Sequence, residues 1–174
     1  MHIAGTEVNL QHKALEVYLS GCKGPHCPGC QNPEIWDFGV GDEVTESVTK
    51  NLLSKIDTMQ KAELLDYVWV LGGEPLDQDL YELENLLSQL KSKANIMLWT
   101  HYEDVPYQIC RHIMYAKLGP YIEIGTPYIE PLFGIKLANK EQRIIECRGL
   151  TYLGTIKKEQ HIVKYHSRCA RRVF

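Results

Sequence analysis

Apolar residues follow two alternating patterns along the 174-residue chain: short continuous runs and stripes with a helical period. Residues 67–71 form a continuous apolar run, which is typical of a strand buried on both faces. Residues 79–91 contain five leucines at helical spacing, which predicts an amphipathic helix. The same patterns predict two strands within residues 7–20 around a turn at 11–13, strands at 95–100 and 121–125, and helices that open at Asp42 and at Asp104–Pro106.

The remaining apolar positions extend this order of elements. The helix that opens at Asp42 places its apolar stripe on Val44, Val48, Leu52 and Ile56, and the helix after Pro106 places its stripe on Ile109, Cys110, Ile113 and Met114. Residues 143–147 and 161–165 are candidates for additional strands.

Strands and helices that alternate in this way predict βαβ units on a mainly parallel sheet with right-handed crossovers. A closed (β/α)8 barrel typically needs about 250 residues, more than this chain has. We therefore expect an α/β fold built as a partial, open (β/α) barrel. No linker or repeat divides the sequence, so residues 1–174 are predicted to be one domain, with a core at about 15–145 and a basic C-terminal extension at 146–174.

Three polar or glycine-rich segments directly follow predicted parallel strands. They are the cysteine-rich segment 22–33, the Gly-Gly-Glu-Pro segment 72–75, and Thr100 with the two residues after it. Parallel α/β sheets bind ligands beyond the carboxyl ends of their strands. The strand order therefore predicts that these three segments meet at one mouth.

Half of the six cysteines, Cys22, Cys27 and Cys30, fall within nine residues. The glycines and prolines between them exclude a helix or a regular strand. Thiolates are soft ligands that favour zinc, copper(I) or an iron–sulfur cluster. The segment is therefore predicted to be a loop that surrounds a metal centre.

Zinc and an iron–sulfur cluster make different demands on this loop. A structural zinc site needs a fourth ligand, for which His26, Cys147 and Cys169 are the candidates, whereas Cys110 is predicted to be a core thiol. A cubic [4Fe–4S] cluster takes one thiolate per iron, so three cysteines leave one iron open to a small molecule. The position of the loop after a buried strand and opposite the Gly-Gly-Glu-Pro turn favours the cluster.

Composition narrows the cellular compartment and the kinds of binding partner that we expect for the protein. Apolar residues make up 44% of the chain and charged residues 24%, as in a globular protein, and the net charge of −3 gives no general attraction to nucleic acid or membranes. No apolar run approaches the roughly 20 residues that span a bilayer, and no signal peptide is expected at the N-terminus. We therefore expect a cytoplasmic protein, whose clustered thiols stay reduced.

The cysteine loop and the Gly-Gly-Glu-Pro turn together resemble the radical S-adenosylmethionine (SAM) enzymes. The similarity is greatest to the small activating proteins of anaerobic ribonucleotide reductases. It extends over about residues 15–145 and includes the segments 27–38, 71–76, 99–102, 119–122 and 139–143.

This resemblance implies that SAM chelates the open iron, that the reduced cluster cleaves SAM to methionine and a 5′-deoxyadenosyl radical, and that this radical takes a hydrogen atom from a glycine of a partner enzyme. It also implies a small electron-donor protein such as flavodoxin or ferredoxin. The implied cluster ligands are Cys22, Cys27 and Cys30, and the implied SAM contacts are Gly29, Gln31, Gly72, Gly73, Glu74, Thr100 and Tyr102. Among the SAM contacts, the Glu74 carboxylate is expected to pair with the ammonium group of SAM.

The chain departs from the family pattern at two positions in the loop. Four residues separate Cys22 from Cys27, where the superfamily usually has three, and Gln31 stands where relatives often have an aromatic residue or histidine. Two alternatives remain open beside the activase. One is a radical SAM enzyme that acts on another glycyl radical enzyme or on a small molecule. The other is a zinc-stabilised module whose basic C-terminal extension binds nucleic acid.

Overall fold

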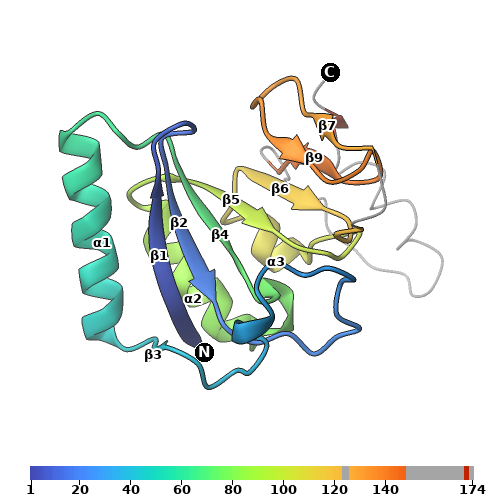
Figure 1. Cartoon of the computed structure of the whole chain (residues 1–174). Helices are drawn as coiled ribbons and strands as arrows, with labels where there is room; N and C mark the ends of the chain where they lie inside the picture. The colour runs from blue at the N-terminus through green and yellow to red at the C-terminus, as the bar shows by residue number, and fades with distance from the viewer. Residues whose placement is uncertain (123–125, 148–170, 173–174) are drawn as a thin grey trace, which may run out of the picture.

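The computed structural model describes residues 1–122, 126–147 and 171–172, which form a large mixed sheet, three helices and a small hairpin (Figure 1). The large sheet has eight strands in the order β10-β9-β6-β5-β4-β2-β1-β3, and β7 and β8 form the hairpin. The strands are β1 (His2–Asn9), β2 (Ala14–Leu19), β3 (Asp42–Glu43), β4 (Tyr67–Gly72), β5 (Asn95–Trp99), β6 (Tyr115–Leu118), β7 (Tyr128–Ile129), β8 (Lys136–Leu137), β9 (Arg143–Glu146) and β10 (Arg171–Arg172). The helices are α1 (Glu46–Lys61), α2 (Leu80–Lys91) and α3 (Tyr107–Cys110), with 3-10 turns η1 (Pro33–Ile35) and η2 (Pro75–Asp77).

Four neighbouring strands, β2, β4, β5 and β6, form the parallel centre of the sheet. Helices α1, α2 and α3 connect them in sequence, so the predicted βαβ units are present. The outer strands β1, β3, β9 and β10 pair antiparallel. The carboxyl ends of the four central strands therefore meet at one edge, and the curvature of a partial, open barrel stays a prediction.

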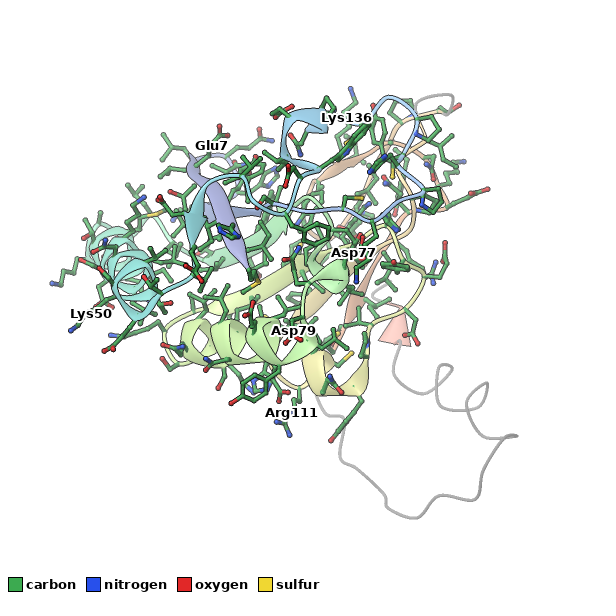
Figure 2. All side chains as sticks on the ribbon, turned by 90° about the horizontal axis from the view of Figure 1, so that it is seen from below. Glu7, Lys50, Asp77, Asp79, Arg111 and Lys136 are labelled. Carbon is green, nitrogen blue, oxygen red and sulfur yellow. The ribbon has the colours of Figure 1, made fainter. Side chains whose placement is uncertain are left out.

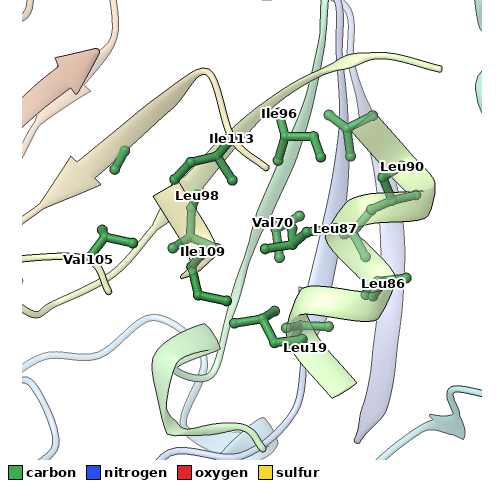
Figure 3. Close-up of a cluster of buried hydrophobic side chains, with 14 of the residues drawn as sticks. Leu19, Val70, Leu86, Leu87, Leu90, Ile96, Leu98, Val105, Ile109 and Ile113 are labelled. Carbon is green, nitrogen blue, oxygen red and sulfur yellow. The ribbon is translucent and has the colours of Figure 1, made fainter. Parts of the chain in front are cut away.

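Different elements pack on the two faces of the sheet. The three helices pack on one face, where Leu87 of α2 and Ile109 of α3 meet Val70 and Leu98 of the central strands (Figure 3). The β7–β8 hairpin packs on the other face, in the core cluster that contains Trp69. Because the helices leave that second face to the hairpin, side chains there are free to line a cavity.

Helix α1 begins later than the sequence predicts. Asp42 was expected to cap the helix, but residues 42–43 form β3 beside β1. The N-cap is Thr45, whose Oγ1 accepts a hydrogen bond from Val48 N at 3.3 Å. Pairing with β1 therefore shifts the N-cap of the helix by three residues, from 42 to 45.

The third helix and the fourth parallel strand also differ from the prediction. Helix α3 ends at Cys110, and β6 follows in residues 115–118, where Met114 N donates to Ile96 O at 2.8 Å and draws the chain into the sheet. The strand predicted at 121–125 is wrong for residues 121–122, which are irregular, and residues 123–125 lie outside the described part. Gly119, with φ +95°, ends β6 just before Pro120.

Only some of the segments predicted near the C-terminus lie within the residues that the structure describes. The strand predicted at 143–147 is β9, whereas residues 161–165 lie outside the described residues. The predicted basic extension, 146–174, also lies outside the described residues, apart from residues 146–147 and 171–172. In the described part of the chain, no helix is long and apolar enough to cross a membrane.

Strands β2 and β4 leave the sheet together, with their backbones in close contact. Gly73 N donates to Leu19 O at 2.7 Å, and Glu74 N donates to Gly21 O at 2.7 Å. A Cβ atom on Gly73 would lie 2.3 Å from Gly21 O, and one on Gly72, which has φ +116°, would lie 2.5 Å from Leu19 O. Contact between two stretches of backbone thus requires both glycines.

We predict that Gly73→Ala destabilises the protein by about 2–3 kcal/mol, because backbone atoms of the loop after β2 have no room to move away. The matched control is Gly5→Ala in β1, where an added Cβ meets nothing within 4 Å. We expect the control to change stability by no more than about 0.5 kcal/mol. Urea denaturation of the two variants measures this difference, and equal midpoints would contradict the packing argument.

Candidate metal and ligand site

A cavity of about 440 Å³ lies at the carboxyl edge of the central strands, between the cysteine loop and the β7–β8 hairpin. Its walls come from all four parallel strands or the segments that follow them. The residues that line it include Cys22, Cys27, Cys30, Gln31, Trp36, Gly72, Gly73, Glu74, Trp99, Thr100, His101, Lys117, Lys136, Leu137 and Gln142. The three segments that the strand order predicts at one mouth therefore line a single cavity.

The cysteine loop is held to the segment around η1 by backbone hydrogen bonds. Gly21 N donates to Ile35 O at 2.8 Å, and Cys22 N donates to Trp36 O at 3.0 Å. All three cysteines of the loop are free thiols of intermediate exposure. Burial raises the pKa of the Cys22 thiol. The loop thus places three free thiols, which are soft metal ligands, along the wall of one cavity.

Three contacts, made by two of its residues, fix the four-residue spacer between Cys22 and Cys27. The His26 ring stacks on Trp36 with 3.7 Å between centroids and 2° between planes, and its Nε2 lies 3.1 Å from Cys22 O. Lys23 N donates to Asp77 Oδ2 at 2.6 Å. His26 therefore serves to order the spacer, and the additional residue is accommodated without displacing a cysteine from the cavity.

Glu74 is the most extensively bonded side chain of the site, with 1% of its surface exposed. Its Oε1 accepts from Thr100 Oγ1 at 2.6 Å and from Leu76 N at 2.9 Å, whereas its Oε2 accepts from His101 N at 2.8 Å and faces His101 Nδ1 at 3.1 Å. Burial raises the pKa of Glu74, and these hydrogen bonds oppose the rise. The carboxylate thus joins the turn after β4 to the loop after β5.

Asp77 and Gln78 complete this connection. Asp77 Oδ1 accepts from Tyr102 Oη at 2.8 Å, and this hydrogen bond raises the pKa of Tyr102 to about 12. Gln78 Nε2 donates to Ser20 O at 2.9 Å. Asp77 lies in η2, ahead of α2 (Figure 2). The sequence analysis missed both residues, although two polar side chains between a Gly-Gly-Glu-Pro turn and an apolar helix are a recognisable signal.

The residues predicted to contact SAM divide into two groups. Gln31, Gly72, Gly73, Glu74 and Thr100 line the cavity. Gly29 and Tyr102 are not among the lining residues: Gly29 forms an exposed turn with φ +69°, and Tyr102 is bonded to Asp77. The structure therefore gathers most of the predicted contacts, and what they bind remains a prediction.

Lys117 is a buried cation on the cavity wall that the sequence analysis did not identify. It lies on β6 with 7% of its surface exposed, and its Nζ donates to Gly119 O at 2.9 Å. Burial lowers the pKa of Lys117 to about 8. A single lysine between apolar residues was the available signal, and it was missed because residues 115–118 were not recognised as a strand.

Cys147, a candidate for a fourth zinc ligand, lies at the opposite edge of the sheet. Its N donates to Met114 O at 2.8 Å, next to the amino end of β6, and its side chain belongs to the helix-side core together with Cys110. The zinc arrangement that uses Cys147 is therefore wrong, and Cys169 lies outside the described part. Within the described residues, no three His, Cys, Asp or Glu side chains converge on one metal ion.

A model of the protein family described as "4Fe-4S single cluster domain" matches residues 11–113, more than half of the chain. The match runs from the turn before β2 to three residues past the end of α3, and it includes the cysteine loop and the turn after β4. No curated protein and no solved structure matches the chain.

We predict that Lys117→Met stabilises the metal-free protein at pH 7 by about 1–3 kcal/mol, because an apolar side chain replaces a buried ammonium group. The folded-state pKa of about 8 is below the ordinary lysine value of 10.5. The unfolded chain therefore binds more protons between these pH values, and wild-type stability rises with pH there.

The advantage of Lys117→Met should accordingly shrink as the pH is raised from 8 towards 10.5. The exposed Lys55, whose Nζ donates to Thr6 Oγ1, provides the control variant Lys55→Met. Urea unfolding at pH 7 and pH 9.5 measures the difference. An advantage that does not change with pH would show that the ammonium is not destabilised by burial.

Proposed function

The chain belongs to the 4Fe-4S single cluster domain family of iron–sulfur proteins, and on this premise we propose that it is a radical SAM activase. In this proposal it installs a glycyl radical on an anaerobic ribonucleotide reductase. One observation supports the proposal most: the three loop cysteines, the Gly-Gly-Glu turn and Thr100 line the same cavity at the carboxyl ends of consecutive parallel strands.

The donor set fits a [4Fe–4S] cluster better than a single closed metal ion. Cys22, Cys27 and Cys30 line the cavity, and the two other described cysteines, Cys110 and Cys147, are buried in the helix-side core. Three thiolates would hold three irons and leave the fourth to SAM. When bound and reduced, the cluster supplies the electron that cleaves the C–S bond of SAM.

The chain itself would hold and orient the two cofactors. The backbone of Gly72 and Gly73 faces the cavity beside the cysteine loop and is suited to approach SAM closely. The carboxylate oxygens of Glu74 are already in contact with Thr100, Leu76 and His101. We therefore propose that Glu74 positions this turn and does not pair directly with the ammonium group of SAM. Gln31 is exposed at the cavity and is suited to contact the adenosine end of SAM.

A protein substrate fits the accessibility of the site. The three cysteines and Gln31 are at least partly exposed, so a loop of another protein can approach the cavity from solvent. The glycine to be activated would lie on such a loop. A small electron donor such as flavodoxin or ferredoxin would reduce the cluster from the same solvent-exposed loop.

Anaerobically reconstituted protein is expected to bind about four irons per chain and, after reduction, to convert SAM to methionine and 5′-deoxyadenosine. Cys27→Ala should lose most of the iron and all SAM cleavage, because one cluster ligand is removed. Cys147→Ser is the matched control, since this thiol lies at the far edge of the sheet. Iron analysis and chromatography of the nucleoside products measure both outcomes.

Stoichiometric zinc without SAM cleavage in the wild type would overturn the proposal. Full iron content in the wild type, together with no cleavage of SAM, would leave an iron–sulfur protein that is not a radical SAM enzyme. Equal iron loss in Cys27→Ala and Cys147→Ser would contradict the assignment of the cluster to the loop.

The protein substrate is tested by electron paramagnetic resonance. We expect a glycyl radical signal when the reduced protein and SAM are incubated with the catalytic subunit of an anaerobic ribonucleotide reductase, and none when the glycine of that subunit is changed to alanine. A signal on a different glycyl radical enzyme only, or SAM cleavage with a small molecule only, would favour the alternative within the radical SAM superfamily.

A further inference from the structure

A second cavity, of about 370 Å³, lies at the amino ends of the central strands. Its lining comes from the turn between β1 and β2, the first half of β4, the start of β6 and the loop of the β7–β8 hairpin. Figure 1 shows the β1–β2 turn at the opposite end of the sheet from the cysteine loop. None of the residues that line this cavity lines the first one. The second cavity is therefore separate from the candidate metal and ligand site, and its volume is within the range of roughly 300–1,000 Å³ that is typical of small-molecule sites.

Four aromatic side chains, all buried or half-buried, line this cavity: Tyr67, Trp69, Tyr115 and Phe133. Two rings pack edge-on against Phe133, that of Tyr115 at 4.8 Å between centroids and that of Tyr67 at 5.8 Å. The His12 ring, which also lines the cavity, lies 5.2 Å from the Trp69 ring. Because planar rings stack favourably on aromatic side chains, this lining is suited to a ligand with a flat ring.

Trp69 is the most buried of the lining residues, with 4% of its surface exposed. Its indole N–H is buried, and the described residues provide no acceptor for it. Buried N–H groups are almost always paired, so an unpaired one beside a cavity indicates a bound water or ligand. Nucleobases carry nitrogen and oxygen acceptors along their edges. The ring that this cavity suits best is therefore a heteroaromatic ring with an acceptor at its edge.

Two opposite charges lie at the rim of the same cavity. Lys13 and Asp66 are both exposed, and their backbones are joined by a hydrogen bond from Asp66 N to Lys13 O at 2.7 Å. In the part of the chain that the structure describes, neither side chain belongs to an ion pair. An ammonium group binds a phosphate, and a carboxylate accepts hydrogen bonds from sugar hydroxyls. The rim thus matches the sugar and the phosphate that a nucleobase carries in a nucleotide.

We propose that this cavity binds a nucleotide, with the base against the aromatic side chains and the Trp69 N–H, and with the phosphate beside Lys13. The inference does not depend on the proposed function, because the two cavities share no residue. A free nucleotide matches the charges better than a nucleic-acid strand does. Grooves that bind single strands are positively charged along their length, whereas this rim pairs one lysine with one carboxylate and the chain has a net charge of −3.

The experiment is anaerobic titration calorimetry of the cluster-loaded full chain with AMP, with adenosine, and with a short single-stranded oligonucleotide. Phe133→Leu removes an aromatic ring and keeps an apolar side chain, Trp69→Phe removes the indole N–H, and Lys13→Gln removes the charge at the rim. The control variants are Lys55→Met on α1, outside both cavities, and Gln31→Ala in the first cavity. Iron content and thermal unfolding establish that each variant is folded and loaded.

We expect the wild type to bind AMP about fivefold more tightly than adenosine, and Lys13→Gln to remove this difference. Phe133→Leu should weaken the binding of both ligands about tenfold, because a stacking surface is lost. Trp69→Phe should weaken both about threefold, because the ring stays and one hydrogen bond is lost. Lys55→Met and Gln31→Ala should bind AMP as the wild type does.

Three results would overturn the inference. One is a wild type that binds no AMP at millimolar concentration, and another is an AMP affinity that neither Phe133→Leu nor Trp69→Phe changes. The third is an equal loss of affinity for AMP and adenosine in Lys13→Gln, a test that stands even where a variant in the aromatic lining fails to fold, since Lys13 is exposed. Tighter binding of the oligonucleotide than of AMP would replace the free nucleotide by a nucleic-acid strand.

Discussion

The geometry of the site depends on one buried polar turn, in which Glu74, Asp77 and Gln78 bond the ends of three strands together. Glu74 bonds the loop after β5, Asp77 bonds both the cysteine loop and Tyr102, and Gln78 bonds the carbonyl of Ser20 at the end of β2. All three side chains are buried. In such an environment an unpaired polar group is costly, so loss of one partner would affect every loop that the turn holds.

This arrangement explains why a loop rich in glycine and proline can present three thiols in a defined place. The loop has little regular structure of its own, and its position is set by bonds to other elements: Gly21 and Cys22 to the segment around η1, and Lys23 to Asp77. The glycines of the turn after β4 bring the two backbones into contact. Placement of the cysteines is therefore a tertiary property, shared between the first and second parallel strands.

The sequence predicts the parts of the fold that depend on local pattern. The apolar run of β4, the leucine stripe of α2 and the alternation of strands with helices are confirmed, and with them the meeting of the cysteine loop and the Gly-Gly-Glu turn. Short elements were missed because their formation depends on distant partners: β3 exists because it pairs with β1, and β6 exists because it pairs with β5 and β9. The error at β6 also concealed Lys117, since a lysine is recognised as buried only once its strand is placed.

The chemistry of the residues was easier to predict than their roles. Glu74 was expected to face an ammonium group, because a carboxylate beside a ligand cavity suggests an ion pair. Its four contacts with Thr100, Leu76 and His101 join the loops, and they are the basis of the positioning role that we propose for it. Lys117, whose position within an apolar strand suggested nothing, makes one bond, to the carbonyl of Gly119, and lies within the influence of the acidic groups of Cys27, Glu74 and Glu103. In a buried site, the role of a charged side chain is therefore inferred from the bonds that it already makes within the protein, and not from its charge alone.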